Sequence, residues 1–166
     1  MSNKVIIKKK ITKFKKVIKV SGDKSLSIRW VLFSSLASGV SKAKNLLMSE
    51  DVLAALEIIK KLGIKVRHRN NICEIYGKGI NGYKYKKNLK LDAKNSGTLG
   101  RLLLGFLIDC PYPIKIIGDK SLSQRDFKRV TDPLSRFGAN FKLSRKNYLP
   151  LTITGSKKLK PINYFE

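Results

Sequence analysis

The sequence contains the same type of helix ending twice, about 75 residues apart. In Lys61–Val66 and again in Arg136–Phe141, a basic and a large apolar residue precede a glycine, and an apolar–polar alternation begins after it. A glycine directly after a helical pattern ends the helix, and alternation predicts a strand. Self-similarity at a fixed period indicates two copies of one supersecondary unit. The chain is therefore expected to fold as a repeat.

Hydrophobic periodicity assigns a similar series of elements to each copy. Helices are expected over residues 25–37, 50–62, 96–109 and 126–137, and strands over residues 40–47, 64–67, 72–76, 89–91, 114–117, 141–143 and 149–153. Apolar and basic residues alternate in Lys4–Lys19, which predicts one or two edge strands there. The expected fold class is α/β, with repeated βαβαββ units whose helices are buried inside the sheets.

This pattern divides the chain into four expected segments. Residues 1–20 form an N-terminal strand segment, residues 21–88 the first unit, residues 89–155 the second unit, and residues 156–166 a tail or linker.

Several local features refine the expected helices. The segment 25–37 is apolar nearly all round, which is typical of a buried helix. Ser49 is a good N-cap for the second helix. Pro133 should kink the last helix or shift its start. Gly97, Gly100 and Gly105 would weaken an isolated helix, so we expect them to serve close backbone approach.

Composition limits the classes of protein to which this chain can belong. The net charge of +25 is typical of a nucleic-acid-binding protein. However, the basic residues are spread along the whole chain, and they comprise 28 lysines but only eight arginines. Base-edge readout relies on arginine, so nucleic acid is a disfavoured partner. No apolar run is long enough for a membrane span or a signal peptide, which predicts a cytoplasmic protein.

Cysteine and histidine usage argues against metal and triad chemistry. Cys73 and Cys110 stand far apart, so neither a zinc site nor a disulfide framework is expected, and both should be reduced, partly buried thiols. His68 is the only histidine, and its flanking arginines and nearby turn favour a surface position.

Three loops each join a strand to the start of a helix, where free backbone N–H groups and the helix dipole favour an anion. They are Gly22–Arg29, Asp92–Thr98 and Gly118–Arg125. The first and third differ only at Ile28 and Gln124, which indicates a recurring chemistry: glycine for a turn, lysine as a point charge, serine as a donor and arginine as a fork. The order of residues is not that of a phosphate-binding Walker loop.

Taken together, the three loops resemble the EPSP synthase (3-phosphoshikimate 1-carboxyvinyltransferase) family. The resemblance rests on Gly22-Asp23-Lys24-Ser25-x-Ser27-x-Arg29, Asn95-Ser96-Gly97-Thr98-x-x-Arg101, and Arg125 followed by Val130-x-Asp132-Pro133-Leu134. Ser25 favours this family over the sister enzyme that acts on UDP-N-acetylglucosamine. Ser21, Ile28 and Asp126 depart from the usual family residues, and an acidic residue beside Arg125 could lower the affinity for phosphate.

The resemblance implies an activity in the shikimate pathway of aromatic amino acid biosynthesis. An enolpyruvyl group passes from phosphoenolpyruvate to the 5-hydroxyl of shikimate 3-phosphate by addition and elimination, with no metal and no cofactor. Lys24, Ser25 and Arg29 would hold shikimate 3-phosphate. Lys24, Asn95, Gly97 and Arg125 would hold phosphoenolpyruvate. The family is usually monomeric.

The resemblance also implies that this chain carries half of a site. Family members are more than twice as long, with two domains of three units each. The groups that transfer protons belong to the second domain, on which residues 1–20 would pack. We therefore expect the isolated chain to be inactive, and its catalytic residues stay unassigned. A non-catalytic remnant, a split-enzyme half and a basic nucleic-acid-binding module are the alternatives.

Overall fold

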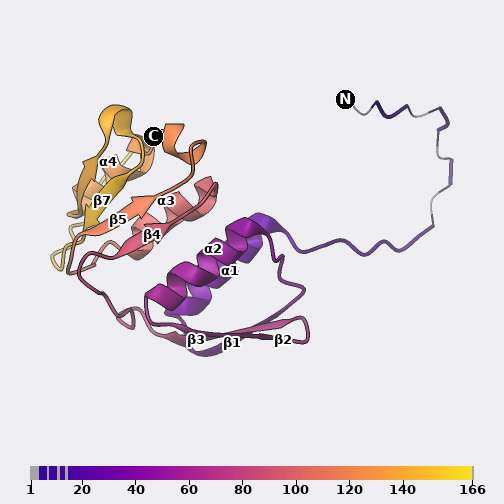
Figure 1. The fold of residues 1–166 in the computed structure, drawn as a ribbon, viewed down its shortest axis with the longest axis horizontal. Coiled ribbons are helices and arrows are strands. Elements are labelled where there is room, and N and C mark those ends of the chain that lie inside the picture. Colours follow the sequence, from indigo (N-terminus) through magenta and orange to yellow (C-terminus); the bar gives the residue numbers. More distant parts are fainter. Residues whose placement is uncertain (1–3, 7, 11, 14, 166) are drawn as a thin grey trace.

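The computed structural model describes residues 4–6, 8–10, 12–13 and 15–165, with four α-helices and seven strands in two sheets. The helices are α1 (Lys24–Leu36), α2 (Glu50–Lys61), α3 (Gly97–Phe106) and α4 (Lys128–Phe137). The strands are β1 (Ser38–Lys44), β2 (Lys65–Arg69), β3 (Ile72–Lys78), β4 (Lys90–Asp92), β5 (Ile114–Ile117), β6 (Asn140–Leu143) and β7 (Leu151–Thr154). The α/β class is confirmed (Figure 1).

The two sheets repeat one arrangement of strands. In the first sheet the order is β1-β3-β2, and in the second it is β4-β5-β7-β6. The antiparallel pairs β1–β3 and β3–β2 correspond to β5–β7 and β7–β6, while β4 adds a parallel neighbour to β5. The second copy thus has the full βαβαββ order. The first copy lacks a strand before α1 within the described residues.

The predicted N-terminal strands are wrong for the part of 4–20 that the structure describes, where no residue belongs to a strand. Residues 7, 11 and 14 lie outside the described residues. Val17 is 97% exposed, and Ile18 and Val20 are also exposed. Alternation predicts a strand only if a partner strand and an apolar surface receive it, and these side chains contact neither.

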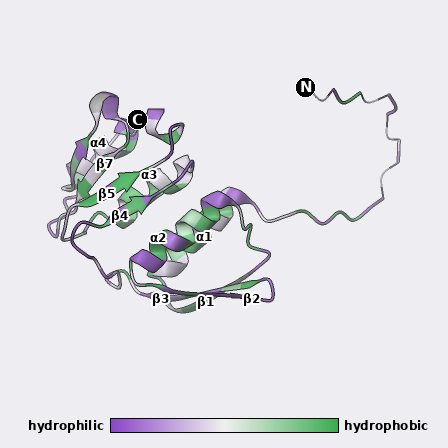
Figure 2. Ribbon diagram, viewed as in Figure 1, coloured by the Kyte–Doolittle hydropathy of each residue, from purple (hydrophilic) through white to green (hydrophobic). Residues whose placement is uncertain are grey.

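Helix α1 is buried on one side only, which corrects the expectation of a helix buried all round. Ile28, Val31 and Leu32 are fully buried, whereas Leu26 and Phe33 are 67% and 62% exposed. The helix packs against β3, α2 and α3, and these neighbours cover only part of its surface. In Figure 2, β5 and much of α1 are coloured as hydrophobic. Apolar composition predicts burial, but neighbouring elements decide which face is covered.

The first hairpin turn is the one predicted from Asn70-Asn71. Both residues have positive φ angles, 50° and 59°, which asparagine tolerates better than most residues. The second hairpin turns through a 3-10 segment at Arg145–Asn147. Helix α4 begins at Lys128 rather than at residue 126 and continues through Pro133.

The expectation of close backbone approach fails at two of the three glycines of α3, because Gly105 has no near neighbour and Gly100 only an ordinary side-chain contact. Nothing lies within 4 Å of the position of a Cβ atom at Gly105, whereas a Cβ at Gly100 would touch the Phe127 ring at 3.4 Å. Ser49 occupies the N-cap position of α2 as predicted, but its side chain makes no capping hydrogen bond. Both cysteines are free and fully buried rather than partly buried, and burial raises the pKa of each thiol.

The segment between β3 and β4 joins the two copies and is a loop, as expected. The Tyr83 hydroxyl lies 2.6 Å from the Ser35 hydroxyl of α1, and Tyr85 donates a hydrogen bond to Asp109 at 3.2 Å. The two tyrosine rings meet edge to face, with their centroids 6.2 Å apart. Tyr83 is 7% exposed, and burial raises its pKa to about 12. This loop therefore bonds to both copies.

Raising the pH should destabilise this junction. Burial favours the neutral phenol, so the contribution of Tyr83 is fully present below the ordinary pKa of 10 and is lost as pH rises through about 12. We expect the loss from Tyr83 to reach about 3 kcal/mol, measured as the free energy of unfolding in urea at stepped pH. Tyr83→Phe should reduce this dependence, and Tyr85, whose pKa burial also raises, accounts for the part that remains. Tyr112→Phe, at an exposed tyrosine, should leave it unchanged. Equal pH slopes in wild type and Tyr83→Phe would contradict the prediction.

Candidate anion-binding site

Three helices begin at one cavity of about 530 Å³. Lys24 is the first residue of α1, Glu50 the first of α2 and Gly97 the first of α3, and all three line the cavity. The other lining residues are Asp51, Asn95, Ser96, Thr98, Arg101 and Arg125. Helix N-termini present free N–H groups and the positive end of the helix dipole, so this convergence favours an anionic ligand.

Lys24 is held at the cavity by an ion pair. Its ammonium lies 3.1 Å from Oδ2 of Asp51, which is in the first turn of α2. The Lys24 side chain is 55% exposed and that of Asp51 only 15%. The pair therefore joins the starts of α1 and α2 and leaves part of the Lys24 side chain open to solvent.

The loop before α3 and the loop before α4 supply further residues of the cavity lining. Nη2 of Arg125 lies 3.4 Å from Oδ1 of Asn95, a long hydrogen bond. Ser96 caps α3 by accepting a hydrogen bond from the backbone N–H of Leu99 at 3.3 Å. Arg125 and Asn95, which are 30 residues apart in sequence, are in this way brought to one surface.

Gly97 leaves the space into which two guanidinium groups fit. A Cβ atom at this position would lie 2.9 Å from Nη1 of Arg101 and 3.0 Å from Nη1 of Arg125. Real Cβ contacts are essentially never shorter than 3.0 Å, so any side chain here would displace at least one arginine. As expected from the sequence, other groups approach the backbone closely at Gly97, and these groups are side chains.

The predicted site residues separate into two groups. Lys24, Asn95, Gly97 and Arg125 all line the cavity. Ser25 and Arg29 follow Lys24 in α1, where Ser25 is half-buried and Arg29 exposed, and neither is among the lining residues. The structure thus brings together the four residues predicted for phosphoenolpyruvate. It places two of the three predicted for shikimate 3-phosphate on the adjoining face of α1.

Sequence analysis assigned neither Asp51 nor Arg101 to the binding site, although Arg101 is the last residue of the second family motif. Arg101 lies four residues after Gly97, and this spacing in a helix beginning at Gly97 could have placed it beside the glycine. Asp51 gave no comparable signal, because its contact with Lys24 depends on how α1 packs against α2.

The likeness of the first and third loops corresponds to a shared local structure. Oδ1 of Asp23 accepts a hydrogen bond from the N–H of Leu26, and Oδ1 of Asp119 accepts one from Leu122, each at 2.7 Å. Each aspartate therefore caps a helical turn. After the first loop the turn continues as α1, whereas after the third it ends in the 3-10 helix Leu122–Gln124.

Asp126, the acidic residue beside Arg125, is engaged at the start of α4. Its Oδ1 accepts a hydrogen bond from the backbone N–H of Lys128 at 2.6 Å, and its carbonyl oxygen accepts one from Nη2 of Arg101 at 3.0 Å. Within the described residues it makes no ion pair with Arg125. The side chain of Asp126 therefore binds the first backbone N–H of α4.

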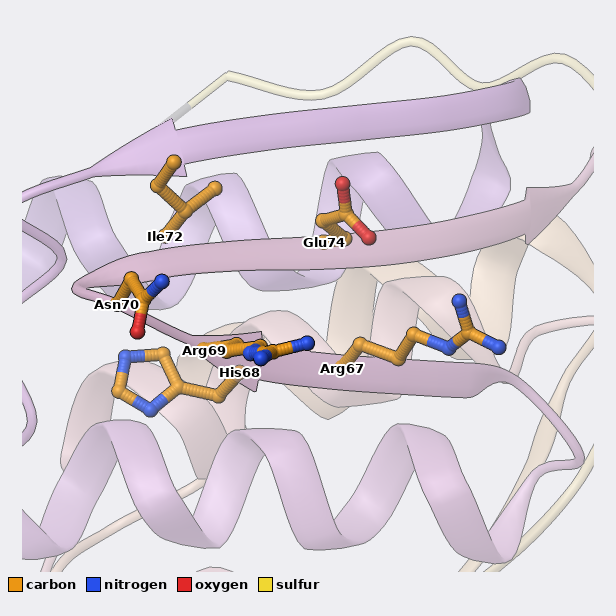
Figure 3. A pocket seen from close by; sticks show the side chains of 6 residues that line it. All are labelled: Arg67, His68, Arg69, Asn70, Ile72 and Glu74. Atoms are coloured by element: carbon orange, nitrogen blue, oxygen red, sulfur yellow. The ribbon is translucent and has the colours of Figure 1, made fainter.

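A second, larger cavity of about 700 Å³ lies on the β2–β3 hairpin (Figure 3). It contains His68, which is exposed on β2 as predicted for a surface histidine. Its one carboxylate, Glu74, is already bonded to Lys42 at 2.9 Å, and this contact lowers the pKa of Glu74. No helix begins at this cavity, so it offers a weaker anion site than the first.

The described residues show neither a metal centre nor a membrane span. No group of three or more histidine, cysteine, aspartate and glutamate side chains gathers among them in a way that could hold a metal ion. None of the described helices is both long and apolar enough to cross a membrane.

Replacing Gly97 by alanine should weaken anion binding without weakening the fold. The new methyl group would displace the guanidinium of Arg101 or Arg125, while alanine is a better helix former than glycine. We expect about a tenfold loss of affinity for inorganic phosphate, followed by NMR titration, with unchanged or higher thermal stability. Gly105→Ala in the same helix meets no atom within 4 Å and should keep the wild-type affinity. Equal affinity in both variants would show that the space at Gly97 is unimportant.

The chain is similar to known proteins over nearly its whole length. The family model for EPSP synthase (3-phosphoshikimate 1-carboxyvinyltransferase) matches residues 8–166. A 3-phosphoshikimate 1-carboxyvinyltransferase of Streptococcus suis is 42% identical over 159 residues, covering 95% of this chain and 37% of its own length. That of Streptococcus mutans is 42% identical over 149 residues, covering 89% of this chain and 34% of its own length.

A solved structure extends the agreement to the fold. The EPSP synthase of Acinetobacter baumannii superposes with a TM-score of 0.82 at 36% identity, covering 89% of this chain and 33% of that one. The chain thus spans about a third of the length of these relatives. Since the EPSP synthase model matches nearly the whole chain, the chain belongs to the EPSP synthase family.

Proposed function

We propose that this chain supplies one wall of an EPSP synthase site that transfers the enolpyruvyl group of phosphoenolpyruvate to shikimate 3-phosphate. The observation that carries this proposal is the cavity that joins Lys24, Asn95, Gly97 and Arg125 at three helix starts. Two substrates with several negative charges need a cationic pocket that offsets their mutual repulsion.

The chemistry of the wall suits binding and orientation. The guanidinium of Arg125 offers a planar fork for a phosphate or carboxylate group, and the ammonium of Lys24 offers a point charge between the two predicted subsites. Arg29 extends the cationic surface along α1 and Ser25 adds a hydroxyl group there, so shikimate 3-phosphate would lie against this part of the helix. The three helix N-termini add fixed positive potential, which costs no reorganisation during the reaction.

Proton transfer has no assigned group on this chain. Glu50 and Asp51 are the carboxylates of the cavity, and Asp51 already holds Lys24 at 3.1 Å. We therefore propose that this chain binds and orients substrates, and that by itself it forms no product.

Calorimetry with shikimate 3-phosphate tests the assignment. Lys24→Ala and Arg29→Ala each remove a charge-assisted contact to a phosphate group, so we expect each to weaken binding at least about tenfold. The purified chain mixed with both substrates should give no product in a phosphate-release assay.

Control variants test whether the loss of any positive charge on the surface weakens binding. Lys42 also pairs with a carboxylate, Glu74 at 2.9 Å, but lies on β1 away from the cavity, so Lys42→Ala should bind normally. Arg129→Ala, at an exposed residue of α4, is the control for Arg29. Unchanged binding in both Lys24→Ala and Arg29→Ala would refute the site assignment, and product from the chain alone would refute the claim that it only binds.

A further inference from the structure

The guanidinium groups of Arg101 and Arg125 share the space above Gly97. Both Nη1 atoms approach the same Cβ position, so they are at most about 6 Å apart, close enough for mutual repulsion. Within the described residues neither arginine forms an ion pair with a carboxylate. Two unpaired positive charges therefore face one cavity.

Arg101 is fixed in this position by groups that do not neutralise it. Its Nη2 donates a hydrogen bond to the carbonyl oxygen of Asp126 at 3.0 Å, and its guanidinium lies 5.1 Å from the ring centroid of Phe127. Its Nε is buried without a hydrogen-bond partner. Burial lowers the pKa of Arg101, Arg129 and Arg125 lower it further, and the carboxylate of Asp126 has a smaller, opposing effect. These contacts hold the side chain beside another cation.

From this arrangement we infer that Arg101 is a specificity-determining residue, which with Arg125 selects a phosphate group carrying two negative charges over one carrying a single charge. The inference rests on the proposed function and extends it to a residue outside the predicted site. A dianion compensates both guanidiniums, whereas a monoanion leaves their repulsion partly uncompensated. Two arginine forks also match the several acceptor oxygens of one phosphate group.

Methyl phosphate is a suitable probe, because it carries a phosphate group but no carboxylate and is not a substrate of the proposed reaction. Phosphate monoesters lose their second proton near pH 6, so the monoanion dominates at about pH 5 and the dianion at about pH 8. Binding is followed by NMR through the arginine Nε–H signals, of which that of Arg101 belongs to a buried group. Wild type should bind about tenfold more tightly at the higher pH.

Substitutions at position 101 separate charge selection from packing. Arg101→Gln should lose the preference for the dianion while keeping most of its affinity for the monoanion. Arg101→Lys keeps the charge and should restore part of the preference. Arg129→Gln removes a nearby exposed charge that does not line the cavity, and should reduce the preference less than Arg101→Gln does. The other charged groups around Arg101 are the same in all these variants: Lys24, Glu50, Asp51, Arg125 and Asp126.

Two outcomes would overturn the inference. If Arg101→Gln keeps the wild-type preference for the dianion, Arg101 only packs against Phe127. If Arg129→Gln loses as much of the preference for the dianion as Arg101→Gln does, the preference comes from the overall positive charge of this surface rather than from Arg101. Thermal melts accompany each titration, and if Arg101→Gln does not fold, Arg101→Lys and the wild-type Nε–H shift decide the question. Because methyl phosphate is not the proposed substrate, failure of shikimate 3-phosphate binding would leave this test intact.

Discussion

The packing of α1 against α2 and α3 is the constraint on which the candidate site depends. Phe33 of α1 and Phe106 of α3 meet edge to face with their centroids 5.2 Å apart, near the ends of the two helices. The ion pair between Lys24 and Asp51 fixes the starts of α1 and α2. Because neighbouring helices start at the same cavity, their free N–H groups and dipoles act on the same ligand. A change in helix packing would therefore alter the electrostatics of the site without altering any cavity residue.

Most of the fold could be predicted from local signals, and the failures share one physical cause. The turn at Asn70-Asn71 and the helix ending at Gly63 follow from backbone preferences of single residues, with a φ of +85° at Gly63. The strands expected in Lys4–Lys19 and the burial of Phe33 depend instead on partner surfaces. Periodicity shows that a face is apolar but not that another element covers it. Local patterns thus predict elements more reliably than their environments.

The site could be predicted to the extent that its residues lie in loops with a recognisable order. Asn95 and Arg125 belong to motifs, and the structure brings them within 3.4 Å. Asp51 acts through a contact between two helices, and its residue type alone does not distinguish it from other charged residues of the chain. Arg101 belongs to the second motif, but the motif does not show that its guanidinium lies beside that of Arg125. The near-identity of Gly22–Arg29 and Gly118–Arg125 has a structural basis, because the aspartate of each loop caps a helical turn. Part of each loop motif therefore stabilises the backbone rather than contacting a ligand.

The carboxylate of Asp51 lies in a cavity that favours anions, and this placement has a physical consequence. An unpaired lysine side chain at a helix start would sample many rotamers, and ordering it on binding costs up to about 2 kcal/mol of side-chain entropy. The ion pair with Asp51 reduces that cost in advance, although a second acceptor competes with the ligand for the same ammonium. The side chain of Arg101 is also ordered in advance, but by different partners. A carbonyl oxygen and an aromatic ring hold it, and neither contact adds a full negative charge. The cavity thus combines one cation that is paired with a carboxylate and two arginines that are not, and these two arginines are the groups on which the proposed preference for anions depends.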